Sequence, residues 1–179
     1  MSSPNPSEDA RRNPEPPLRS LGLVLWLTLA LCGAMAASAD NLLTEGSTLI
    51  LDNSLEGVQR EVLERSEGGV FDIGETQGLR PGGASGINLL HSFGVFELAS
   101  GDTANFHADH PTENFVIRVP DSVTIMEGAL DTETGPNTDA ANLYWLSPLG
   151  VIFGDDATLD VGGSLAVSTA DSLNFDADG

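Results

Sequence analysis

Two histidines stand among acidic residues in one short stretch of the chain, at His107, Asp109, His110 and Glu113. Imidazole and carboxylate groups in such proximity are typical ligands of zinc and related metal ions. A metal site also needs partners that orient its ligands, and no further motif in the sequence supplies them. We therefore expect these side chains to be hydrated at the surface, and we predict no metal site.

The neighbours His91 and Ser92 have the residue types of a general base and a nucleophile. Adjacent residues on a strand point to opposite faces, so the imidazole cannot easily reach the hydroxyl. Asp155 and Asp156 could serve as acids or calcium ligands in a β-helical polysaccharide lyase or hydrolase, which is one alternative. Against it, residues 40–179 contain no lysine to act as a base, and Arg118 is the only cation expected in the ordered strands. We predict no enzymatic activity and no catalytic or cofactor-binding residues.

Charge narrows the possible partners further. Residues 40–179 hold four arginines, no lysine and 24 acidic residues. Such a surface repels phosphate backbones and anionic lipid head groups, so nucleic acid is not expected as a partner. Acidic residues spread through turns are interpreted as a device for solubility, with calcium binding as the alternative.

The first residues have the pattern of an export signal. Three arginines precede the apolar run 21–31, and Ala37-Ser38-Ala39 supplies the small residues that a signal peptidase reads. We therefore expect a polar N-terminal extension and signal peptide over residues 1–39, cleavage before Asp40, and one domain over 40–179. An uncleaved anchor is the alternative. Cleavage would remove Cys32, the only cysteine, and a chain without disulfides can be threaded through a narrow pore.

Beyond Asp40, short apolar runs alternate with Gly, Asn, Asp, Pro and Ser at intervals too short for helices. The predicted strands are 47–51, 70–73, 93–98, 114–119, 122–126, 143–146, 151–153, 158–161, 164–167 and 173–175. Residues 55–67 alone have some helical character and could equally form strand. From Leu143 onward the strands recur about every eight residues, so three strands make a coil of roughly two dozen residues, as in solenoids.

These intervals favour a parallel β-helix in which inward side chains stack into one apolar column. The side chains expected there are Leu143, Ile152, Leu159, Val161, Leu165, Val167 and Leu173. A terminal rung must be continued or capped. Because no cap follows Leu173, we expect the C-terminus to be truncated.

Several segments of the chain resemble the secretion domain of filamentous haemagglutinin-type proteins. Residues 88–93, Asn-Leu-Leu-His-Ser-Phe, resemble the run that leads into the first regular coil of that family, and residues 114–119 resemble its Asn-Ile-Ile-Ser-Arg-Val strand. Residues 142–154 resemble its Asn-Leu-Phe-Leu-Ile-Asn-Pro-Asn-Gly-Ile-(Ile/Val)-Phe-Gly signature, and 159–170 its Val-Gly-Gly-Ser tail. Ser147 and Leu149 replace the asparagines that flank the proline in the family. A serine can bond its own turn weakly, but a leucine cannot.

The resemblance implies an all-β fold, a right-handed single-stranded parallel β-helix with N-terminal capping strands. It also implies the N-terminal secretion domain of a two-partner-secreted surface adhesin from a Gram-negative-type envelope. Such a chain crosses the inner membrane by its signal peptide. The periplasmic modules of an outer-membrane β-barrel transporter then recognise it while it is still extended, and it folds outside as a secreted or cell-surface protein. Host or neighbouring-cell ligands would bind repeats beyond this domain.

On this basis we assign transporter recognition to seven residues: Asn88, His91, Ser92, Phe93, Ser147, Pro148 and Gly150. Turn chemistry or core packing is the alternative role for each of them. The alternative to the whole assignment, besides a polysaccharide lyase or hydrolase, is a structural extracellular β-helix with no dedicated transporter.

Overall fold

The computed structural model describes residues 46–132, 137, 138 and 140–174. Its strands are β1 (Thr48–Leu51), β2 (Glu61–Val62), β3 (Val70–Ile73), β4 (Asn88–Leu98), β5 (Thr103–Phe106), β6 (Asn114–Arg118), β7 (Thr124–Met126), β8 (Ala129–Asp131), β9 (Asn142–Leu146), β10 (Val151–Phe153), β11 (Thr158–Asp160) and β12 (Leu165–Ser168). Two short 3₁₀ turns, η1 (Glu75–Gln77) and η2 (Gly83–Ser85), are the helical elements of this part of the chain. It contains no helix that is long and apolar enough to cross a membrane.

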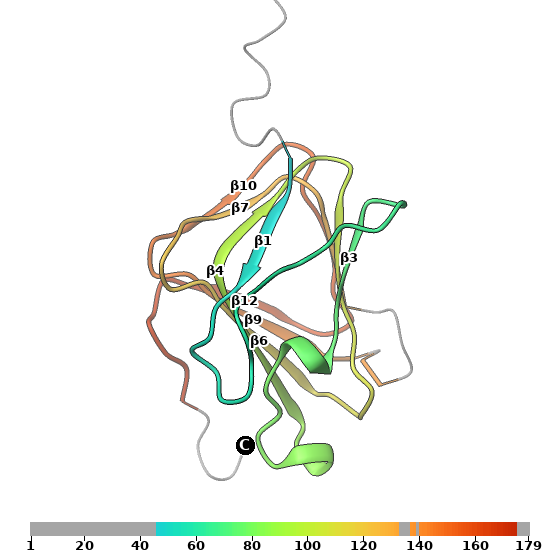
Figure 1. Cartoon of the computed structure of the whole chain (residues 1–179), viewed down its shortest axis with the longest axis vertical. Coiled ribbons are helices and arrows are strands. Elements are labelled where there is room, and N and C mark those ends of the chain that lie inside the picture. Colours follow the sequence, from blue (N-terminus) through green and yellow to red (C-terminus); the bar gives the residue numbers. More distant parts are fainter. Residues whose placement is uncertain (1–45, 133–136, 139, 175–179) are drawn as a thin grey trace, which may run out of the picture. The chain divides into compact units, whose positions relative to one another are not determined.

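Parallel pairing stacks the strands on three sides of a coil. One side holds β4, β6, β9 and β12, the second holds the end of β4 with β7 and β10, and the third holds β3, β5, β8 and β11. Successive strands visit these sides in turn, from β6 to β7 to β8 and then from β9 to β10 to β11. Figure 1 shows β6, β9 and β12 lying together, with β7 beside β10. This connectivity confirms the predicted parallel β-helix.

The length of a coil varies from rung to rung. Pairing joins residues 26 apart at Asn88 and Asn114, 28 apart at Asn114 and Asn142, and 22 apart at Leu143 and Leu165. The predicted two dozen residues per coil fall inside this range. Since pairing fixes the strands, the corners between them take up the differences.

Antiparallel strands close the N-terminal end of the coil. Strand β1 pairs antiparallel with the second half of β4, and the short β2 pairs antiparallel with β1. Residues 55–67, which were ambiguous between helix and strand, therefore contain turns and one two-residue strand. The edge of the first coil is thus covered by chain that does not coil.

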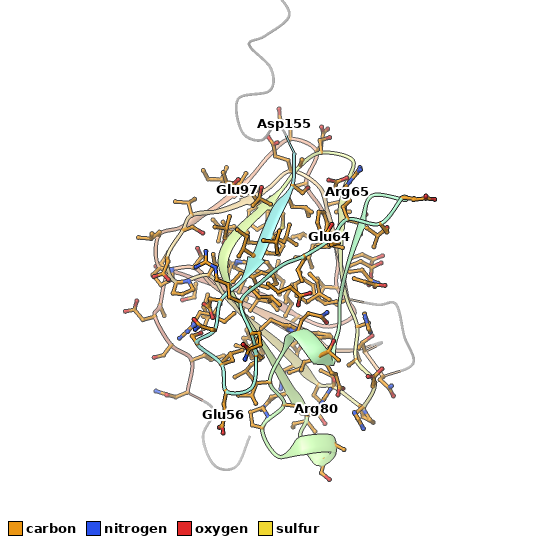
Figure 2. All side chains as sticks on the ribbon, in the orientation of Figure 1. Glu56, Glu64, Arg65, Arg80, Glu97 and Asp155 are labelled. Atoms are coloured by element: carbon orange, nitrogen blue, oxygen red, sulfur yellow. The ribbon has the colours of Figure 1, made fainter. Side chains whose placement is uncertain are left out.

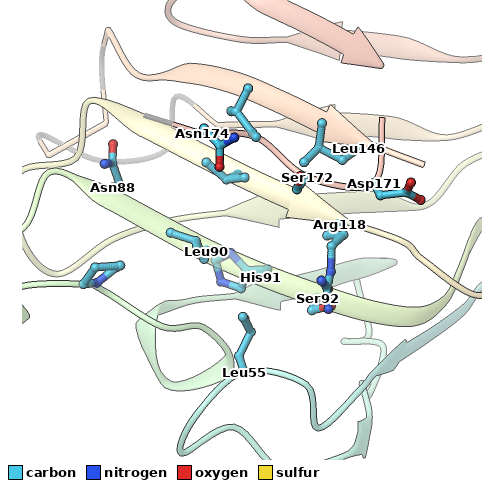
Figure 3. A pocket seen from close by; sticks show the side chains of 13 residues that line it. Leu55, Asn88, Leu90, His91, Ser92, Arg118, Leu146, Asp171, Ser172 and Asn174 are labelled. Carbon is cyan, nitrogen blue, oxygen red and sulfur yellow. Dashed lines mark hydrogen bonds between the residues drawn. The ribbon is translucent and has the colours of Figure 1, made fainter. Parts of the chain in front are cut away.

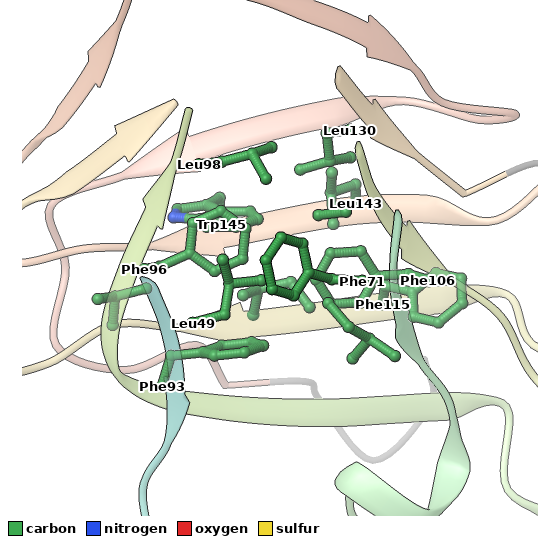
Figure 4. Packing of buried hydrophobic residues seen from close by; sticks show 14 of the residues in the cluster. Leu49, Phe71, Phe93, Phe96, Leu98, Phe106, Phe115, Leu130, Leu143 and Trp145 are labelled. Carbon is green, nitrogen blue, oxygen red and sulfur yellow. The ribbon is translucent and has the colours of Figure 1, made fainter. Parts of the chain in front are cut away.

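Aromatic rings fill the space between the three sides. Trp145, Phe96 and Phe106 are buried, with the Trp145 ring centroid 4.7 Å from that of Phe96 and 6.4 Å from that of Phe106, both edge to face. Figure 4 shows these rings together with Phe93 and Phe115 inside the ribbon. Edge-to-face pairs add about 0.5 to 1.5 kcal/mol beyond the burial of their area. The inward-pointing positions of successive rungs therefore form one continuous core.

Among the residues that the structure describes, none stacks above the last rung. Leu159, Leu165 and Val167 are in register with the buried Leu130, Leu143 and Trp145, yet each is at least 40% exposed. Their inward direction confirms the prediction for these three positions. The uppermost apolar layer of the described coil is consequently open to solvent.

Some local predictions were wrong. Ile152 lies in register with the half-buried Ile125, whereas its neighbour Phe153 is in register with the buried Met126 and points inward. Strands β5 and β8 were not predicted, β4 begins five residues before the predicted 93, and Leu173 and Asn174 are not in a strand. The predicted signal peptide and cleavage site lie outside the described residues.

The charged side chains lie mostly at the periphery. Figure 2 labels Glu56, Glu64, Arg65 and Asp155, all of which are exposed residues of turns and loops. Arg80 differs from them because only 6% of its side chain is accessible. The acidic surface therefore surrounds a core that is almost free of charge.

Candidate functional site

The first predicted recognition residue, Asn88, is the lowest member of an asparagine ladder. Asn114 Nδ2 donates to Asn88 Oδ1 at 2.7 Å, and Asn142 Nδ2 donates to Asn114 Oδ1 at 3.0 Å. Asn142 Oδ1 in turn accepts from the backbone N–H of Ser164 at 2.9 Å. The side-chain amides thus repeat the backbone ladder at the outer face of β4, β6 and β9, and they align one end of each rung.

His91 points into the coil and is buried. Its Nε2 lies 3.0 Å from the carbonyl oxygen of Gly74, and its ring lies edge to face with Phe106 at 5.4 Å and stacked with Phe115 at 6.4 Å. No hydrogen-bond partner reaches the buried Nδ1. Burial lowers the pKa of His91 to about 4, although the bond to Gly74 opposes this shift. His91 is therefore neutral at pH 7, with the proton on Nε2.

Ser92 points to the other side of β4 and is covered by the segment after β1. Its hydroxyl donates to Asp52 Oδ2 at 2.7 Å, while Ser54 Oγ donates to Asp52 Oδ1 at 2.6 Å. Arg118 Nη2 donates to Ser54 Oγ at 2.7 Å. Burial alone would raise the pKa of Asp52, but the bonds from Ser54 and Ser92 outweigh it and leave this pKa below its ordinary value. Ser92 thus bonds to Asp52 rather than to His91.

The second segment predicted to take part in recognition, Ser147 to Gly150, is a tight turn. Gly150 N–H donates to the Ser147 carbonyl at 2.9 Å, and Ser147 Oγ donates to the Gly150 carbonyl at 2.7 Å. Gly150 has φ of +109°, a conformation that favours glycine. The serine hydroxyl therefore does bond its own turn, as predicted, while Leu149 is 59% exposed.

A chain of buried hydrogen bonds joins this turn to the core. Trp145 Nε1 donates to Thr124 Oγ1 at 3.1 Å, and Thr124 Oγ1 donates to Ser147 Oγ at 3.2 Å. Ser147 is completely buried, in contrast to the partly exposed Pro148. The turn is thus stabilised by the hydrogen bond from Thr124 in β7 as well as by bonds within the turn itself.

The structure brings the two predicted segments to one corner of the coil. Ser92 is in register with Arg118, and Arg118 is in register with Leu146, the residue before Ser147. A second proline corner lies between them at Pro120, which sequence reasoning did not select. Its signal is the spacing of 28 residues from Pro120 to Pro148, the same as from Asn114 to Asn142.

A groove of about 440 Å³ lies beside this corner, on the outer face of β4, β6 and β9. Leu90, Val116 and Leu146 form its apolar floor, and Asn88, Ser92 and Arg118 contribute polar groups. Figure 3 shows Arg118 close to Ser92, with Leu55 on one side and the segment of Asp171 and Ser172 on the other. Three of the residues assigned to recognition border the groove: the partly exposed Asn88 and the buried His91 and Ser92.

Accessibility divides the seven residues into two groups. His91, Ser92, Phe93 and Ser147 are buried, and Asn88, Pro148 and Gly150 are partly exposed. In the folded domain, only the second group can present side chains or turn backbone to a partner. Contact with the buried group requires a chain that has not yet folded.

The other chemical candidates remain apart. His110 Nδ1 lies 2.9 Å from Glu75 Oε2, and His107 Nε2 lies 3.8 Å from Asp72. Within the described ranges, no group of three or more His, Cys, Asp or Glu residues could hold a metal ion. Asp156 accepts a hydrogen bond from Ser100 at 2.7 Å.

Comparison with protein families gives one match, to the model described as the TPS secretion domain, over residues 49–179. Neither the curated proteins nor the solved structures contain a significant match to this chain. The family match covers well over half of the sequence and includes both recognition segments, which confirms the resemblance found in the motifs. The chain therefore belongs to the TPS secretion domain family, the N-terminal domain of filamentous haemagglutinin-type two-partner-secreted proteins.

Proposed function

We propose that residues 40–179 are the part of a secreted surface adhesin by which an outer-membrane β-barrel transporter recognises its cargo. The family match carries this proposal, because it identifies a secretion domain. Family membership makes the chain part of a two-partner-secreted protein. The transporter, its periplasmic recognition modules and the adhesive role are the steps that we add.

The burial pattern supports recognition before folding. Four of the seven assigned residues are inaccessible in the folded coil. An extended chain in the periplasm would offer Asn88 to Phe93 as an unpaired strand, and a transporter module could add it to its own sheet by β-augmentation. The same residues would become buried later, when the chain leaves the barrel. One segment can therefore serve as a recognition signal first and as part of the core afterwards.

Folding outside the cell would then favour outward movement. Each large apolar side chain that enters the core contributes about 1.5 to 3 kcal/mol relative to exposure. Residues 40–179 contain no cysteine, so no disulfide has to form or break during passage. The stacked coil can form rung by rung, because each rung contacts only its neighbours.

The remaining features of the proposal concern handedness, processing and ligands. We propose a right-handed coil, since a crossover between parallel neighbours of one sheet is right-handed in about 98% of cases. Residues 1–39 would be removed as a signal peptide. Host or neighbouring-cell ligands would bind repeats beyond this domain. We propose no catalytic role, which an assay of acidic polysaccharide cleavage would test.

Export in a host that carries the partner transporter tests this function. The protein in the medium and on the cell surface is measured with and without the transporter, for the full chain and for two alanine variants. Asn88→Ala is expected to abolish most export. Asn114→Ala is the matched control, because it removes amide bonds of the same ladder on both sides but lies outside the assigned residues. Export without the transporter, or equal export of both variants, would contradict recognition at Asn88.

A further inference from the structure

Residues 74–86, which we call the strap, cover the lower edge of β4. One edge of the first half of β4 pairs with β6. At the other edge, Leu79 N–H donates to the Leu90 carbonyl at 2.8 Å, and Leu90 N–H donates to the Leu79 carbonyl at 2.9 Å. This single antiparallel bridge is much shorter than a regular strand pair. The strap is therefore attached to the edge by few backbone bonds and depends on side-chain anchors.

All three histidines of the chain contact the first two residues of the strap. His91 bonds to the Gly74 carbonyl, and a side chain at Gly74 would come within 2.6 Å of the His107 ring. His110 Nδ1 lies 2.9 Å from Glu75 Oε2, and its backbone N–H donates to Glu75 Oε1 at 3.0 Å. The first two residues of the strap are thus held by imidazole side chains from three positions of the coil.

Arg80 holds the strap from inside. Its guanidinium pairs with Glu75 and also donates to the Gly86 carbonyl at 2.7 Å and to Thr112 Oγ1 at 2.8 Å. Burial would raise the pKa of Glu75, but hydrogen bonds from Arg80 and His110 outweigh it and keep this pKa below its ordinary value. The Glu75 carboxylate therefore remains ionised in mild acid, and the pairing with Arg80 does not loosen there.

His91 differs from Glu75, because a second proton on its ring would find no hydrogen-bond acceptor while the strap covers it. That proton would bind Nδ1, which is buried and has no acceptor. Phe106 and Phe115 lie against the ring, and His107 and Arg80 disfavour its positive charge, whereas Glu75 favours it. In addition, a side chain at Gly78 would come within 2.9 Å of Nε2, so the strap fits closely over the ring. A charged His91 reaches water only when the strap moves away.

We propose that the strap opens when His91 takes up a proton, so that acidification frees the β4 edge while the stacked sheets remain folded. Opening replaces a buried imidazole by a hydrated imidazolium. It also exposes the N–H and C=O of Leu90, which an extended segment of another chain could pair with. This device goes beyond export and does not depend on the identity of any transporter.

Amide hydrogen exchange of the full chain at pH 7 and pH 5, expressed as protection factors, tests the proposal. With a His91 pKa of about 4 when the strap is closed and an ordinary 6.5 when it is open, the opening equilibrium increases about twentyfold between these pH values. The protection of Leu79 and Leu90 should fall by this factor. The protection of Phe115 and Ile117 in β6 should also fall, because complete unfolding frees His91 as well, but it should stay well above that of Leu79 and Leu90 at both pH values. Equal protection of all four amides would mean that the strap opens only by global unfolding and would overturn the proposal.

Two matched variants identify the proton acceptor. His91→Gln retains a donor for the Gly74 carbonyl but cannot titrate, so its protection at Leu79 should change less than twofold between pH 7 and pH 5. His110→Gln removes the more exposed histidine that also binds the strap, and it should keep the twentyfold response. If the response were lost in His110→Gln or persisted in His91→Gln, His91 would not be the switch. Should His91→Gln fail to fold, the comparison of the four amides in the native chain still decides the outcome.

Discussion

Replacing Thr124 by valine should destabilise the domain through the indole of Trp145. Thr124 Oγ1 is the acceptor of the buried Trp145 Nε1–H, and both residues are essentially inaccessible to water. Valine keeps the shape of threonine but leaves the N–H without a partner, which costs about 1 to 3 kcal/mol. Ser147 keeps its bond to the Gly150 carbonyl, so the loss on that side is small. We expect the free energy of unfolding to fall by about 2 kcal/mol.

A double-mutant cycle separates this hydrogen bond from packing. Trp145→Phe removes the N–H, so adding Thr124→Val to it should cost only about 0.5 kcal/mol, and the coupling between the sites should be about 1 to 2 kcal/mol. Urea unfolding at pH 7, followed by far-ultraviolet circular dichroism, measures all four proteins. Thr132→Val is the control, because no described residue bonds the buried Thr132 hydroxyl, so its loss should be neutral or stabilising. Equal costs of Thr124→Val in the tryptophan and phenylalanine backgrounds would refute the reasoning.

Three further predictions concern the corner between β7 and β8, the asparagine ladder and the buried His91. Gly128→Ala should cost more than 2 kcal/mol in urea unfolding, because its Cβ would meet the Asp102 carbonyl oxygen at 2.3 Å, whereas Gly46→Ala, with nothing within 4 Å, should stay within about 0.5 kcal/mol. Asn114→Ala should lower the midpoint of urea unfolding more than Asn88→Ala, since Asn114 bonds both neighbouring rungs; the reverse order would exclude an additive ladder. Because the pKa of His91 is lower in the folded state, the neutral imidazole should make its full contribution to stability above pH 6.5, and the free energy of unfolding should fall by about 3 kcal/mol between pH 6.5 and 4. A pH profile that His91→Gln leaves unchanged would contradict this.

The periodic part of the fold could be predicted because its signals are local. Strands β9 to β12 lie in apolar runs bounded by Gly, Pro and Asp, and their predicted bounds differ from the observed ones by at most one residue. Strands β5 and β8 were missed because β5 has two buried positions and β8 has one, which is too few for a recognisable apolar run. Strand β5 reads Thr-Ala-Asn-Phe, and its outward residues are the polar Thr103 and Asn105. Ile152 was placed inward by hydrophobicity, although Val151 and Phe153 point that way, since in a three-residue strand alternation cannot show which face is buried.

The burial of the residues assigned to recognition could not be predicted from the sequence. The residues assigned to recognition could be selected by motif, but their burial depends on partners far away in the chain. Asp52 covers Ser92 from 40 positions before it, and Gly74 binds His91 from 17 before it. No local sequence pattern predicts contacts between residues so far apart in the chain. The asparagine ladder, by contrast, has a signal in the sequence that the prediction did not use: Asn88, Asn114 and Asn142 begin their strands at intervals of 26 and 28 residues.

The ladder of identical amides has a consequence for fidelity of assembly. Every step between two asparagines offers the same donor and the same acceptor, so the ladder aligns rungs but cannot tell one rung from the next. A chain that looped out its middle turn could place Asn142 directly on Asn88 with equivalent amide bonds. The inward side chains in the same register, His91, Ile117 and Trp145, differ in size and shape, so a skipped rung would bring different neighbours into contact in the core. The packing of side chains inside the coil therefore specifies which rungs stack together, and the amides only align them.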